Sequence, residues 1–409
     1  MRIALTVDFS AWSAYSGGAQ KSTHQLALAL VDRGHDVVVF CTRGWSERVD
    51  APAGLPYDVR WVPLLSPRAQ PRSALRALTF LWMRPAVQRW LDESPGETAV
   101  VHSQGDEGAH FHRLRSRGRL AHVATLRHPL YPDARPPAAR LARLAWWIRT
   151  PKWGLQRMTA RRAQICAPAS RNAADLIAAY YGVEQERLEV VPNGLDEVFL
   201  GDAVAREEMA QSVVFAGRFE RSKGIETLLE AWSRLGAKAP RLTLFGQGQV
   251  DVVQETIAQR GLASRVSVGG WVAGAELARV LRGAGLVVVP SHHESFGNAV
   301  VEAMASGAPL VASAVGSVPE LVEHARTGWL VPPQDPDALA EAVRRLMAEP
   351  ALRRRLGAAA RAHAASRFGW DRTAHQFEQL YDRLVQAEAG RTAGPGLVAG
   401  DRRPERWPA

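Results

Sequence analysis

The sequence predicts an α/β protein of two domains, each built on a doubly wound parallel sheet. Its 409 residues are enough for two domains that each bury a core of their own. Two stretches also carry the strand–helix pattern that opens such a sheet. One runs from a strand at Arg2–Val7 through a helix to a strand at Asp36–Phe40, and the other pairs a strand at Ser212–Ala216 with a helix at Ile225–Ser233.

The composition is that of a globular protein without covalent cross-links. Apolar residues make up 46% of the chain and charged residues 22%, which is ordinary. Cys41 and Cys166 are the only cysteines, so no disulfide framework supports the fold and a reducing cytosol fits. The chain enters a strand pattern at once, without an N-terminal signal, and the apolar stretch Ala77–Met83 ends at Arg84, far short of a membrane span. We therefore expect a cytoplasmic protein.

The net charge of +10 lies entirely in the first half of the chain. Residues 1–195 contain 26 Lys and Arg against 16 Asp and Glu, whereas residues 196–409 contain 25 of each. Between Glu107 and Asp175 the only acid is Asp133, while eight basic residues crowd the stretch 135–162. This asymmetry predicts an anionic partner for the first half.

Tryptophans accompany the basic segment. Trp146, Trp147 and Trp153 lie among its arginines, as in a helix that rests on an anionic membrane surface. The same composition suits a nucleic-acid surface, but no helix-turn-helix, RRM or zinc-finger pattern accompanies it, so we expect no nucleic-acid partner. The alternative is that the tryptophans fill the domain core while the arginines stay solvated. A basic amphipathic stretch at 72–85 allows the same choice between a membrane helix and a domain helix.

The stretch that carries most chemistry is Ser291–Gly307. It follows a short strand of β-branched residues that Pro290 ends, and it continues as a polar turn and then a helix that begins near Gly297. The free N–H groups and positive dipole end of such a helix favour an anion. Glu294 in the turn and Glu302 in the helix are suited to accept hydrogen bonds from sugar hydroxyls.

Glu294 and Glu302, with the Ser-Phe-Gly and Ala-Met-Ala-Ser-Gly that flank them, resemble the EX7E signature of retaining glycosyltransferases of family GT4. The resemblance implies the GT-B fold, in which two Rossmann-like domains face each other across a cleft and the second binds most of the nucleotide-sugar. It also implies site roles. Glu294 would contact the donor sugar, the amides of Phe296, Gly297 and Asn298 would meet sugar and phosphate, and Glu302 would hold the ribose.

Two further stretches match the family where it binds the donor. Arg218 and Lys223 follow the strand at 212–216, where two cations can clamp a diphosphate from two directions, and the family uses these positions that way. Gly17 and Gly18 precede the first helix, and glycine lets a backbone approach phosphate or sugar closely. A plain loop explains this glycine pair equally well on local grounds, because no G-x-G-x-x-G is present. In the family a glycine-rich loop at this place faces the donor.

One stretch departs from the family pattern. GT4 enzymes often place a histidine after a strand, in a T-x-H pattern near the acceptor and the anomeric carbon. Here Thr125 is followed by Leu126, Arg127 and His128, so Arg127 occupies that position and His128 the next. His128 is a candidate catalytic residue because it lies near the carboxyl end of a strand, where α/β clefts open. Which of the two faces the reacting centre stays open.

No metal site is predicted. Asp335-Pro336-Asp337 superficially resembles a D-x-D metal motif, but an Asp followed by Pro at the start of an apolar periodic stretch indicates a capped helix. His292 and His293 have no further ligand cluster at usable spacing.

The Pro-Asn-Gly turn before Asp196 matches the segment that leaves the first domain in the family. We expect an acceptor-side domain at residues 1–195, a nucleotide-sugar-binding domain at 196–367 and a disordered tail at 389–409. One amphipathic helix at 367–384 is expected to cross back, which adds residues 368–388 to the first domain.

The resemblance to GT4 implies a metal-independent hexosyltransferase that moves a sugar from a nucleotide-diphospho-sugar to a hydroxyl acceptor with retention of configuration. Arg218, Lys223 and the helix N-terminus would stabilise the leaving diphosphate, so no cofactor is expected beyond this co-substrate. A lipid-linked acceptor or a cell-envelope glycan, reached by peripheral binding at the inner face of the cell membrane, fits the basic first half. The alternatives are a nucleotide-sugar epimerase or a phosphorylase on the same fold, or a non-catalytic sugar- or membrane-binding partner. The nucleotide, the sugar, the acceptor and the oligomeric state stay open.

Overall fold

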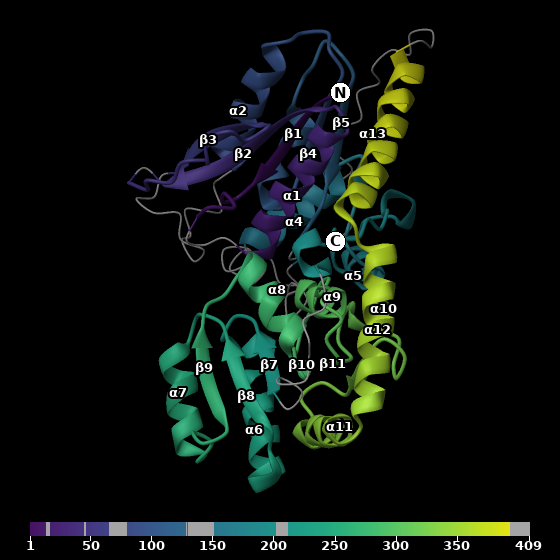
Figure 1. Ribbon diagram of the computed structural model, residues 1–409. Coiled ribbons are helices and arrows are strands. Elements are labelled where there is room, and N and C mark those ends of the chain that lie inside the picture. Colours follow the sequence, from purple (N-terminus) through teal and green to yellow (C-terminus); the bar gives the residue numbers. More distant parts are fainter. Residues whose placement is uncertain are drawn as a thin grey trace, which may run out of the picture.

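A computed structural model shows two α/β domains that lie one above the other in Figure 1. It describes residues 1–13, 17–44, 46–64, 80–127, 129, 151–201 and 212–392. Each domain contains one six-stranded sheet, and every strand pair in both sheets is parallel. The predicted α/β fold with two Rossmann-like domains is therefore confirmed.

The first sheet has the strand order β3-β2-β1-β4-β5-β6. Its strands are β1 (Arg2–Val7), β2 (Asp36–Gly44), β3 (Asp58–Leu64), β4 (Ala99–Ser103), β5 (Leu120–Ala124) and β6 (Ile165–Cys166). The order reverses between β1 and β4, and a crevice opens at the carboxyl ends of strands where this happens. The residues that follow β1, β4 and β5 therefore line the place where an α/β domain binds ligands.

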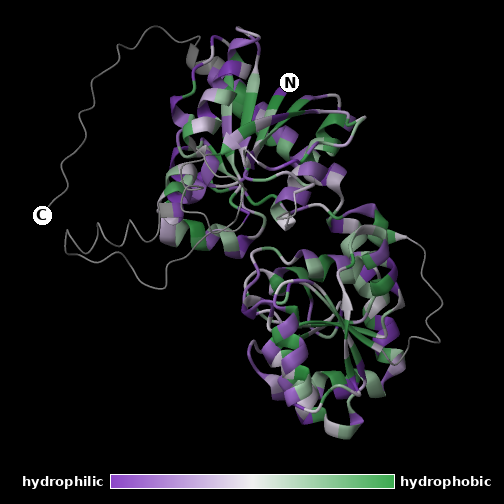
Figure 2. Cartoon of the chain, turned by 90° about the vertical axis from the view of Figure 1, so that its left-hand side faces the viewer, coloured by the Kyte–Doolittle hydropathy of each residue, from purple (hydrophilic) through white to green (hydrophobic). Residues whose placement is uncertain are grey.

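Helices cover both faces of the first sheet. Alternate residues of β1 point to opposite sides, so that Ile3 and Leu5 pack with α1 (Gly18–Asp32) and α13 (Trp370–Thr392), whereas Ala4 packs with α2 (Phe80–Asp92). Helices α4 (Pro151–Arg162) and α5 (Arg171–Tyr181) follow the strands β5 and β6. The strands form apolar inner layers in both domains (Figure 2).

The second sheet repeats this topology, with the order β12-β11-β10-β7-β8-β9. Its strands are β7 (Ser212–Ala216), β8 (Arg241–Phe245), β9 (Val266–Gly270), β10 (Leu286–Val289), β11 (Leu310–Ser313) and β12 (Trp329–Val331). Its helices are α6 (Ile225–Leu235), α7 (Val250–Gln259), α8 (Gly274–Gly283), α9 (Asn298–Ala305), α10 (Val318–Leu321), α11 (Pro336–Ala348) and α12 (Pro350–Arg367). The reversal of order lies between β10 and β7, so the residues after these two strands share the second crevice.

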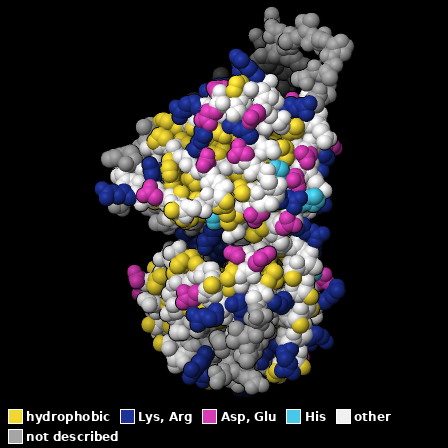
Figure 3. All heavy atoms as spheres, turned by 45° about the horizontal axis from the view of Figure 1, so that its top comes forward, with side chains coloured by type: hydrophobic (Ala, Val, Ile, Leu, Met, Phe, Trp, Pro, Cys, Tyr) yellow, Lys and Arg dark blue, Asp and Glu magenta, His cyan; other side chains and the backbone are white. Residues whose placement is uncertain are grey.

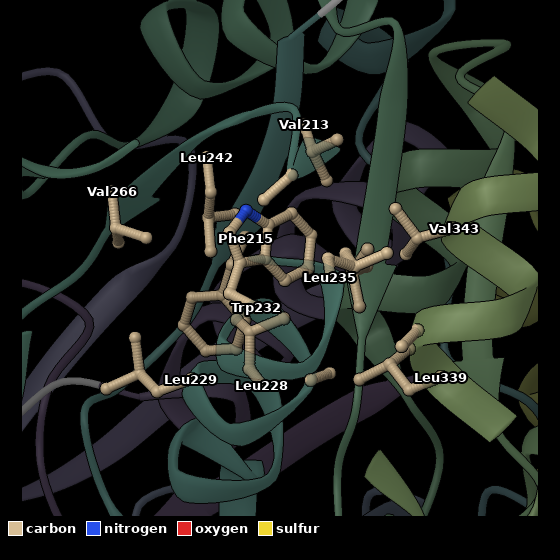
Figure 4. Close-up of a cluster of buried hydrophobic side chains, with 14 of the residues drawn as sticks. Val213, Phe215, Leu228, Leu229, Trp232, Leu235, Leu242, Val266, Leu339 and Val343 are labelled. Carbon is tan, nitrogen blue, oxygen red and sulfur yellow. The ribbon is translucent and has the colours of Figure 1, made fainter. Parts of the chain in front are cut away.

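The core of the second domain is centred on α6. Trp232 is fully buried and its indole N–H donates to the carbonyl of Pro240 at 2.9 Å, so burial leaves no polar atom of this side chain unpaired. Around it lie side chains of β7, β8 and α11, among them Phe215 and Leu339 (Figure 4). Helices α8 and α9 pack on the opposite face of the sheet. This two-sided packing fixes the start of α9, on which the candidate site depends.

The helix expected at 367–384 is present as α13, although it begins three residues later, at Trp370. Phe368 and Gly369 separate it from α12, and the carbonyl of Phe368 accepts a hydrogen bond from the N–H of Leu195 at 2.6 Å. Helix α12 packs on the second domain and α13 runs alongside the first (Figure 1). Helix α13 continues to Thr392, so residues 389–392 of the predicted tail are helical, and residues 393–409 lie outside the described part.

Trp153 belongs to the core and not to an exposed interfacial surface. It is 5% exposed and packs edge-to-face on Tyr181, with 6.1 Å between the ring centroids. The membrane interpretation was therefore wrong for this tryptophan. Trp146 and Trp147 lie outside the described residues, as do positions 72–79 of the predicted basic helix. None of the helices in the described part of the chain combines the length and the apolar character needed to cross a bilayer.

Candidate active site between the two domains

The turn between β10 and α9 holds Glu294 in a buried position. One oxygen of its carboxylate, Oε1, accepts hydrogen bonds from the ammonium of Lys223 at 2.7 Å and from the hydroxyl of Ser291 at 2.8 Å. Within the described part of the chain, the second oxygen, Oε2, accepts no side-chain hydrogen bond. The carboxylate is thus oriented by two donors while one oxygen is left for a ligand.

Lys223 reaches Glu294 because two loops of the second domain are packed tightly together. Gly224 has a φ of 70°, and a Cβ at this position would lie 1.8 Å from the carbonyl oxygen of Pro290, so only glycine fits. The N–H of His292 donates to the carbonyl of Ser222 at 2.9 Å. These contacts bring the loop after β7 against the loop after β10. Arg218 lies in the first of these loops with its side chain exposed.

The N-termini of α9 and α1 face each other across the domain boundary. Gly297 caps α9 with a φ of 91°, and Gly17 caps α1. A Cβ at Gly18 would lie 2.9 Å from Nδ2 of Asn298, which means that the first residues of the two helices nearly touch. Each helix presents unpaired N–H groups and a partial positive charge at this end. Two positive helix ends from different domains therefore converge at one point, which favours an anion.

Phe296, between Glu294 and the helix, faces away from this point. Its ring is 6% exposed and packs edge-to-face on Phe368, with 6.0 Å between the centroids. The side chain therefore anchors the turn in the core, and its backbone amide is the part that a ligand could meet.

Glu302 lies in α9 and is partly buried. Burial raises the pKa of this carboxyl to about 7; the nearby ammonium of Lys21 opposes the rise, and the charges of Asp196 and Glu294 add to it. Lys21 belongs to the first turn of α1, so the two converging helices also carry the groups that set this pKa. At neutral pH Glu302 is close to half ionised.

On the first domain, Arg127 is buried at the carboxyl end of β5. Its Nε donates to Oε1 of Gln104 at 2.8 Å, and its Nη1 donates to the side-chain oxygen of Asn193. Asn193 in turn donates to the side-chain oxygen of Asn298 at 3.2 Å. Arg127 is thereby joined to the start of α9. His128, the candidate catalytic histidine, lies outside the described residues.

His102 of β4 links the residues after β5 to α13 through hydrogen bonds. Thr125 donates its hydroxyl hydrogen to the carbonyl of Ala167 at 2.9 Å, so it accepts from Nε2 of His102 at 2.8 Å. Nδ1 of His102 then accepts from the hydroxyl of Tyr381 on α13 at 2.7 Å. Burial and the positive charge of Arg127 hold the pKa of His102 well below its ordinary value, which keeps the imidazole neutral.

The acidic group Asp8, Asp106 and Glu107 was missed by the sequence reasoning. Their carboxylate oxygens lie within 4.8 Å of one another, and the ammonium of Lys152 lies 3.7 Å from Asp8 and 3.5 Å from Asp106. Burial, together with the two neighbouring carboxylates, raises the pKa of Glu107 to about 8. The signal was present in the sequence, because Asp8 directly follows β1 and the other two closely follow β4, and the ends of adjacent parallel strands meet.

The two domains also meet at the N-terminus of α5. Glu320 of the second domain accepts hydrogen bonds from the N–H of Arg171 at 2.8 Å and of Asn172 at 2.6 Å. The hydroxyl of Ser170 donates to the carbonyl of Ser295 at 2.7 Å. A carboxylate at a helix N-terminus is a favourable contact, and here it joins the two domains. In Figure 3 the molecule narrows between its two lobes, and basic side chains lie at this waist.

Comparison with known proteins identifies the family. The profile of the family described as Glycosyltransferase Family 4 matches residues 16–199, and that of Glycosyl transferases group 1 matches residues 202–363. The D-inositol 3-phosphate glycosyltransferase of Xylanimonas cellulosilytica is 31% identical to this chain, over 92% of the chain and 94% of the relative. The chain is a family 4 glycosyltransferase.

Other similar proteins agree with this assignment. The glycosyltransferase is 30% identical to an MMP alpha-(1->4)-mannosyltransferase of Mycolicibacterium hassiacum, over 94% of the chain and 98% of the relative. Its fold matches the sucrose-phosphate synthase of Thermosynechococcus elongatus with a TM-score of 0.78 at 25% identity, covering 94% and 99% of the two chains. It also matches Anabaena HepE in complex with UDP-glucose with a TM-score of 0.70 at 21% identity, covering 94% and 100%. The expected membership of GT4 is confirmed.

Proposed function

We propose that this glycosyltransferase binds a nucleoside-diphosphate sugar between its domains and transfers the sugar to a hydroxyl acceptor with retention of anomeric configuration. The observation that carries the proposal is the convergence of the N-termini of α1 and α9 at Gly18 and Asn298. A diphosphate at this point would meet two positive helix ends. Lys223 and Arg218 lie in the neighbouring loop and are our candidate ligands of its oxygens.

Each remaining site residue has a role in this proposal. Oε2 of Glu294 accepts a hydrogen bond from a hydroxyl of the donor sugar, because Oε1 already accepts from Lys223 and Ser291. Glu302 accepts from the ribose hydroxyls, and the amides of Phe296, Gly297 and Asn298 face sugar and phosphate. The fold neighbour HepE has been solved with UDP and with UDP-glucose, which supports a nucleotide-sugar as donor.

The chemistry follows from where charge develops. When the bond from the sugar to the diphosphate breaks, negative charge grows on the leaving phosphate, and fixed positive groups there lower the barrier. Lys223, Arg218 and the two helix ends supply that charge from the protein itself, so the proposed reaction uses neither a metal nor a cofactor. The leaving phosphate then takes the proton of the acceptor hydroxyl on the same face. The mannosyltransferase relative is named for an alpha linkage, and an α product from an α-linked donor is retention.

The proposed acceptor is a hydroxyl group of a lipid-linked compound or of a cell-envelope glycan. The excess charge of the first domain, 26 basic against 16 acidic residues in positions 1–195, favours an anionic surface at that side. Trp153 lies in the core, so it does not contribute an interfacial tryptophan to this attraction.

A donor and acceptor panel tests the proposed function. UDP-, GDP- and ADP-sugars are incubated singly with inositol, inositol 3-phosphate, phosphosugars and phospholipid acceptors, and acceptor-dependent release of nucleoside diphosphate is measured. Glu294→Gln is the control for contaminating activity. An epimerase would change the sugar without releasing the diphosphate, a phosphorylase would require inorganic phosphate, and a non-catalytic partner would bind without turnover. Any of these outcomes would contradict the proposal.

A further inference from the structure

Gln104 and Arg127 form a pair of buried side chains at the carboxyl ends of β4 and β5. Gln104 is 4% exposed and Arg127 is 8% exposed. The hydrogen bond from Nε of Arg127 to Oε1 of Gln104, at 2.8 Å, identifies Oε1 as the accepting end of the amide and leaves Nε2 as its donor end. Among the described residues, neither Nε2 of Gln104 nor Nη2 of Arg127 finds an acceptor. A buried hydrogen-bond donor without an acceptor is rare in proteins. It destabilises the fold unless a bound ligand supplies the acceptor.

The guanidinium of Arg127 also lacks a counter-charge in the described part of the chain. Its two acceptors, Gln104 and Asn193, are neutral amides. Burial lowers its pKa to about 10, which still leaves it charged at neutral pH. A buried charge without an opposite charge is destabilising. The structure therefore holds a cation that an anion from outside would stabilise.

The acidic residues at the same edge do not serve as that anion. Glu107 accepts from the backbone N–H of Gln104 at 2.7 Å and from the hydroxyl of Thr6 at 3.1 Å, and its raised pKa of about 8 keeps it mostly neutral at pH 7. Asp8 and Asp106 lie beside the ammonium of Lys152. Within the described part of the chain, none of these three carboxyl groups pairs with Arg127, so its positive charge has no counter-charge there.

The place of the pair relates it to the proposed donor site. Asn193 accepts from Arg127 and donates to Asn298 at 3.2 Å, so the guanidinium is two hydrogen bonds away from the first residue of α9. Arg127 nevertheless belongs to the first domain, on the other side of the cleft from Lys223 and Glu294. Saturating the donor site with UDP, as in the binding measurement below, separates an anion on Arg127 from the diphosphate at the helix ends.

We propose that Arg127 and Gln104 bind a second oxyanion of the substrates, a carboxylate or a phosphate, through the free Nη2 and Nε2 donors. Two sources share this chemistry: a phosphate or carboxylate on the acceptor, or the carboxylate of a sugar-acid donor. The inference rests on the proposed function, since it places the group beside the reacting sugar. A guanidinium with a neighbouring amide suits the two oxygens of such a group.

The first measurement needs no turnover. Inorganic phosphate is titrated into the full chain saturated with UDP, and binding is followed by calorimetry. Arg127→Met should abolish the binding, whereas Arg119→Met, an exposed arginine just before the other end of β5, should leave it intact. If UDP does not bind, the proposed donor site is wrong. The phosphate titration still decides this inference, because it compares the wild type with Arg127→Met.

A second variant guards against a folding defect in Arg127→Met. Gln104→Glu places a carboxylate against the guanidinium and supplies the missing counter-charge from within. This variant should melt at the same temperature as the wild type or higher, yet lose the phosphate binding. A site whose role was only structural would not show this opposite response.

The kinetic arm distinguishes the two sources. Values of kcat/KM are compared for UDP-glucose against UDP-glucuronic acid, and for phosphorylated against unphosphorylated acceptors, in the wild type and in Arg127→Gln. The variant should lose about 10- to 100-fold on the anionic member of one pair only, the loss expected for a charge-assisted hydrogen bond. If kcat/KM falls for the anionic donor, the bound anion is the carboxylate of the donor sugar. If it falls for the phosphorylated acceptor, the bound anion is the phosphate of the acceptor. Absence of phosphate binding that depends on Arg127, together with equal losses on charged and neutral substrates, would overturn the inference.

Discussion

A methyl group at Gly18 would lie 2.9 Å from Nδ2 of Asn298, although the two residues start helices in different domains. This contact joins the glycine pair of the first domain to the Glu294 turn of the second. It gives a steric reason for a glycine at the start of α1, because a larger residue there would have to displace the side-chain amide of Asn298. Both helices have their free N–H groups at these ends.

Gly18→Ala tests this close approach. The added methyl group should displace the side-chain amide of Asn298 at the start of α9, because a Cβ contact under 3 Å cannot persist. We expect kcat/KM to fall by about 10- to 100-fold, the scale for misplacing reacting groups by a fraction of an ångström to one ångström. The melting temperature should not fall, since alanine is a better helix former than glycine. Ala19→Ser, one position along α1, is the control; equal activity in Gly18→Ala would contradict a narrow functional cleft.

Lys223→Ala and Arg218→Ala should lower turnover more than they disturb folding, because the charge that both residues meet grows in the transition state. Lys223 is the sharper test, since its removal also releases the Glu294 carboxylate that it holds at 2.7 Å. Steady-state kinetics and thermal melting of each variant provide the measurement. Activity of the wild type and of the variants should also survive EDTA, whereas a strict need for Mg2+ or Mn2+ would refute the metal-free arrangement.

Glu302→Ala should weaken binding of the free nucleoside diphosphate by about 1–3 kcal/mol, the range for the loss of a charged hydrogen bond. The expectation comes from its place in α9, beside the converging helix ends. Calorimetry on the folded variant decides it, with Glu255→Ala on the surface of α7 as a control far from the cleft. An unchanged affinity would remove Glu302 from the site.

Donor affinity should also depend on pH through Glu302. Its pKa is raised to about 7, so the carboxylate that accepts the ribose hydroxyls forms as the pH rises through 7. Affinity should increase by about tenfold between pH 6 and pH 8, and binding should release protons. An intact nucleotide-sugar is the right ligand, because a terminal phosphate titrates near pH 6 and a diphosphate diester does not. Glu302→Gln should give a flat profile; a flat profile in the wild type would contradict the role.

Glu107→Gln should change how stability depends on pH. The folded protein keeps a proton on Glu107 up to a pKa of about 8, whereas the unfolded chain loses it near the ordinary value of 4.5, so stability falls as pH rises between these values. Glutamine keeps the two hydrogen bonds that Oε1 accepts and removes this fall. Between pH 6.5 and pH 8.5, the unfolding free energy of the variant relative to wild type should grow by on the order of 1–3 kcal/mol. Denaturant titrations at both pH values measure it, and parallel profiles would show that Glu107 is ionised in the fold.

Membrane binding is tested by sedimentation with vesicles. The wild type should bind vesicles that contain anionic lipid, less so as salt is added, because each basic residue near the surface contributes about 1 kcal/mol. Changing Arg140, Arg143 and Arg149 together to Glu should weaken the binding. The same change at the exposed Arg344, Arg354 and Arg355 of the second domain should not. Equal sedimentation with neutral vesicles, or none with anionic ones, would leave the basic segment without this role.

Local pattern sufficed for the elements whose residues are close in sequence. The strand, turn and helix from Leu286 to Ala305 could be predicted because β-branched residues, a proline and a glycine mark its boundaries. The Asp335 cap with Pro336 at the first helical position was confirmed for the same reason. The neighbouring loop of Lys223 was found through a family resemblance, since nothing local shows that Gly224 packs on Pro290.

The features that could not be predicted from the sequence depend on contacts between distant segments. The hydrogen bonds that join Arg127 to Gln104 and Asn193 span 23 and 66 positions, so no local pattern marks them. The hydrogen bond between Leu195 and Phe368, at the break between α12 and α13, likewise joins positions far apart in the sequence. Trp153 looked interfacial from its basic neighbours, and only its packing on Tyr181 shows that it is core.

The central claim is that the converging helix ends hold a nucleotide-sugar whose sugar is transferred with retention. Proton NMR of the reaction, recorded as the first product forms, measures it most directly, because the anomeric coupling is read before any later exchange. With an α-linked donor found by the panel, we predict that the first glycoside is α-configured and accumulates in step with the nucleoside diphosphate. Glu294→Gln should abolish both signals together. A β-configured first product, or release of the diphosphate without a glycoside, would contradict the account.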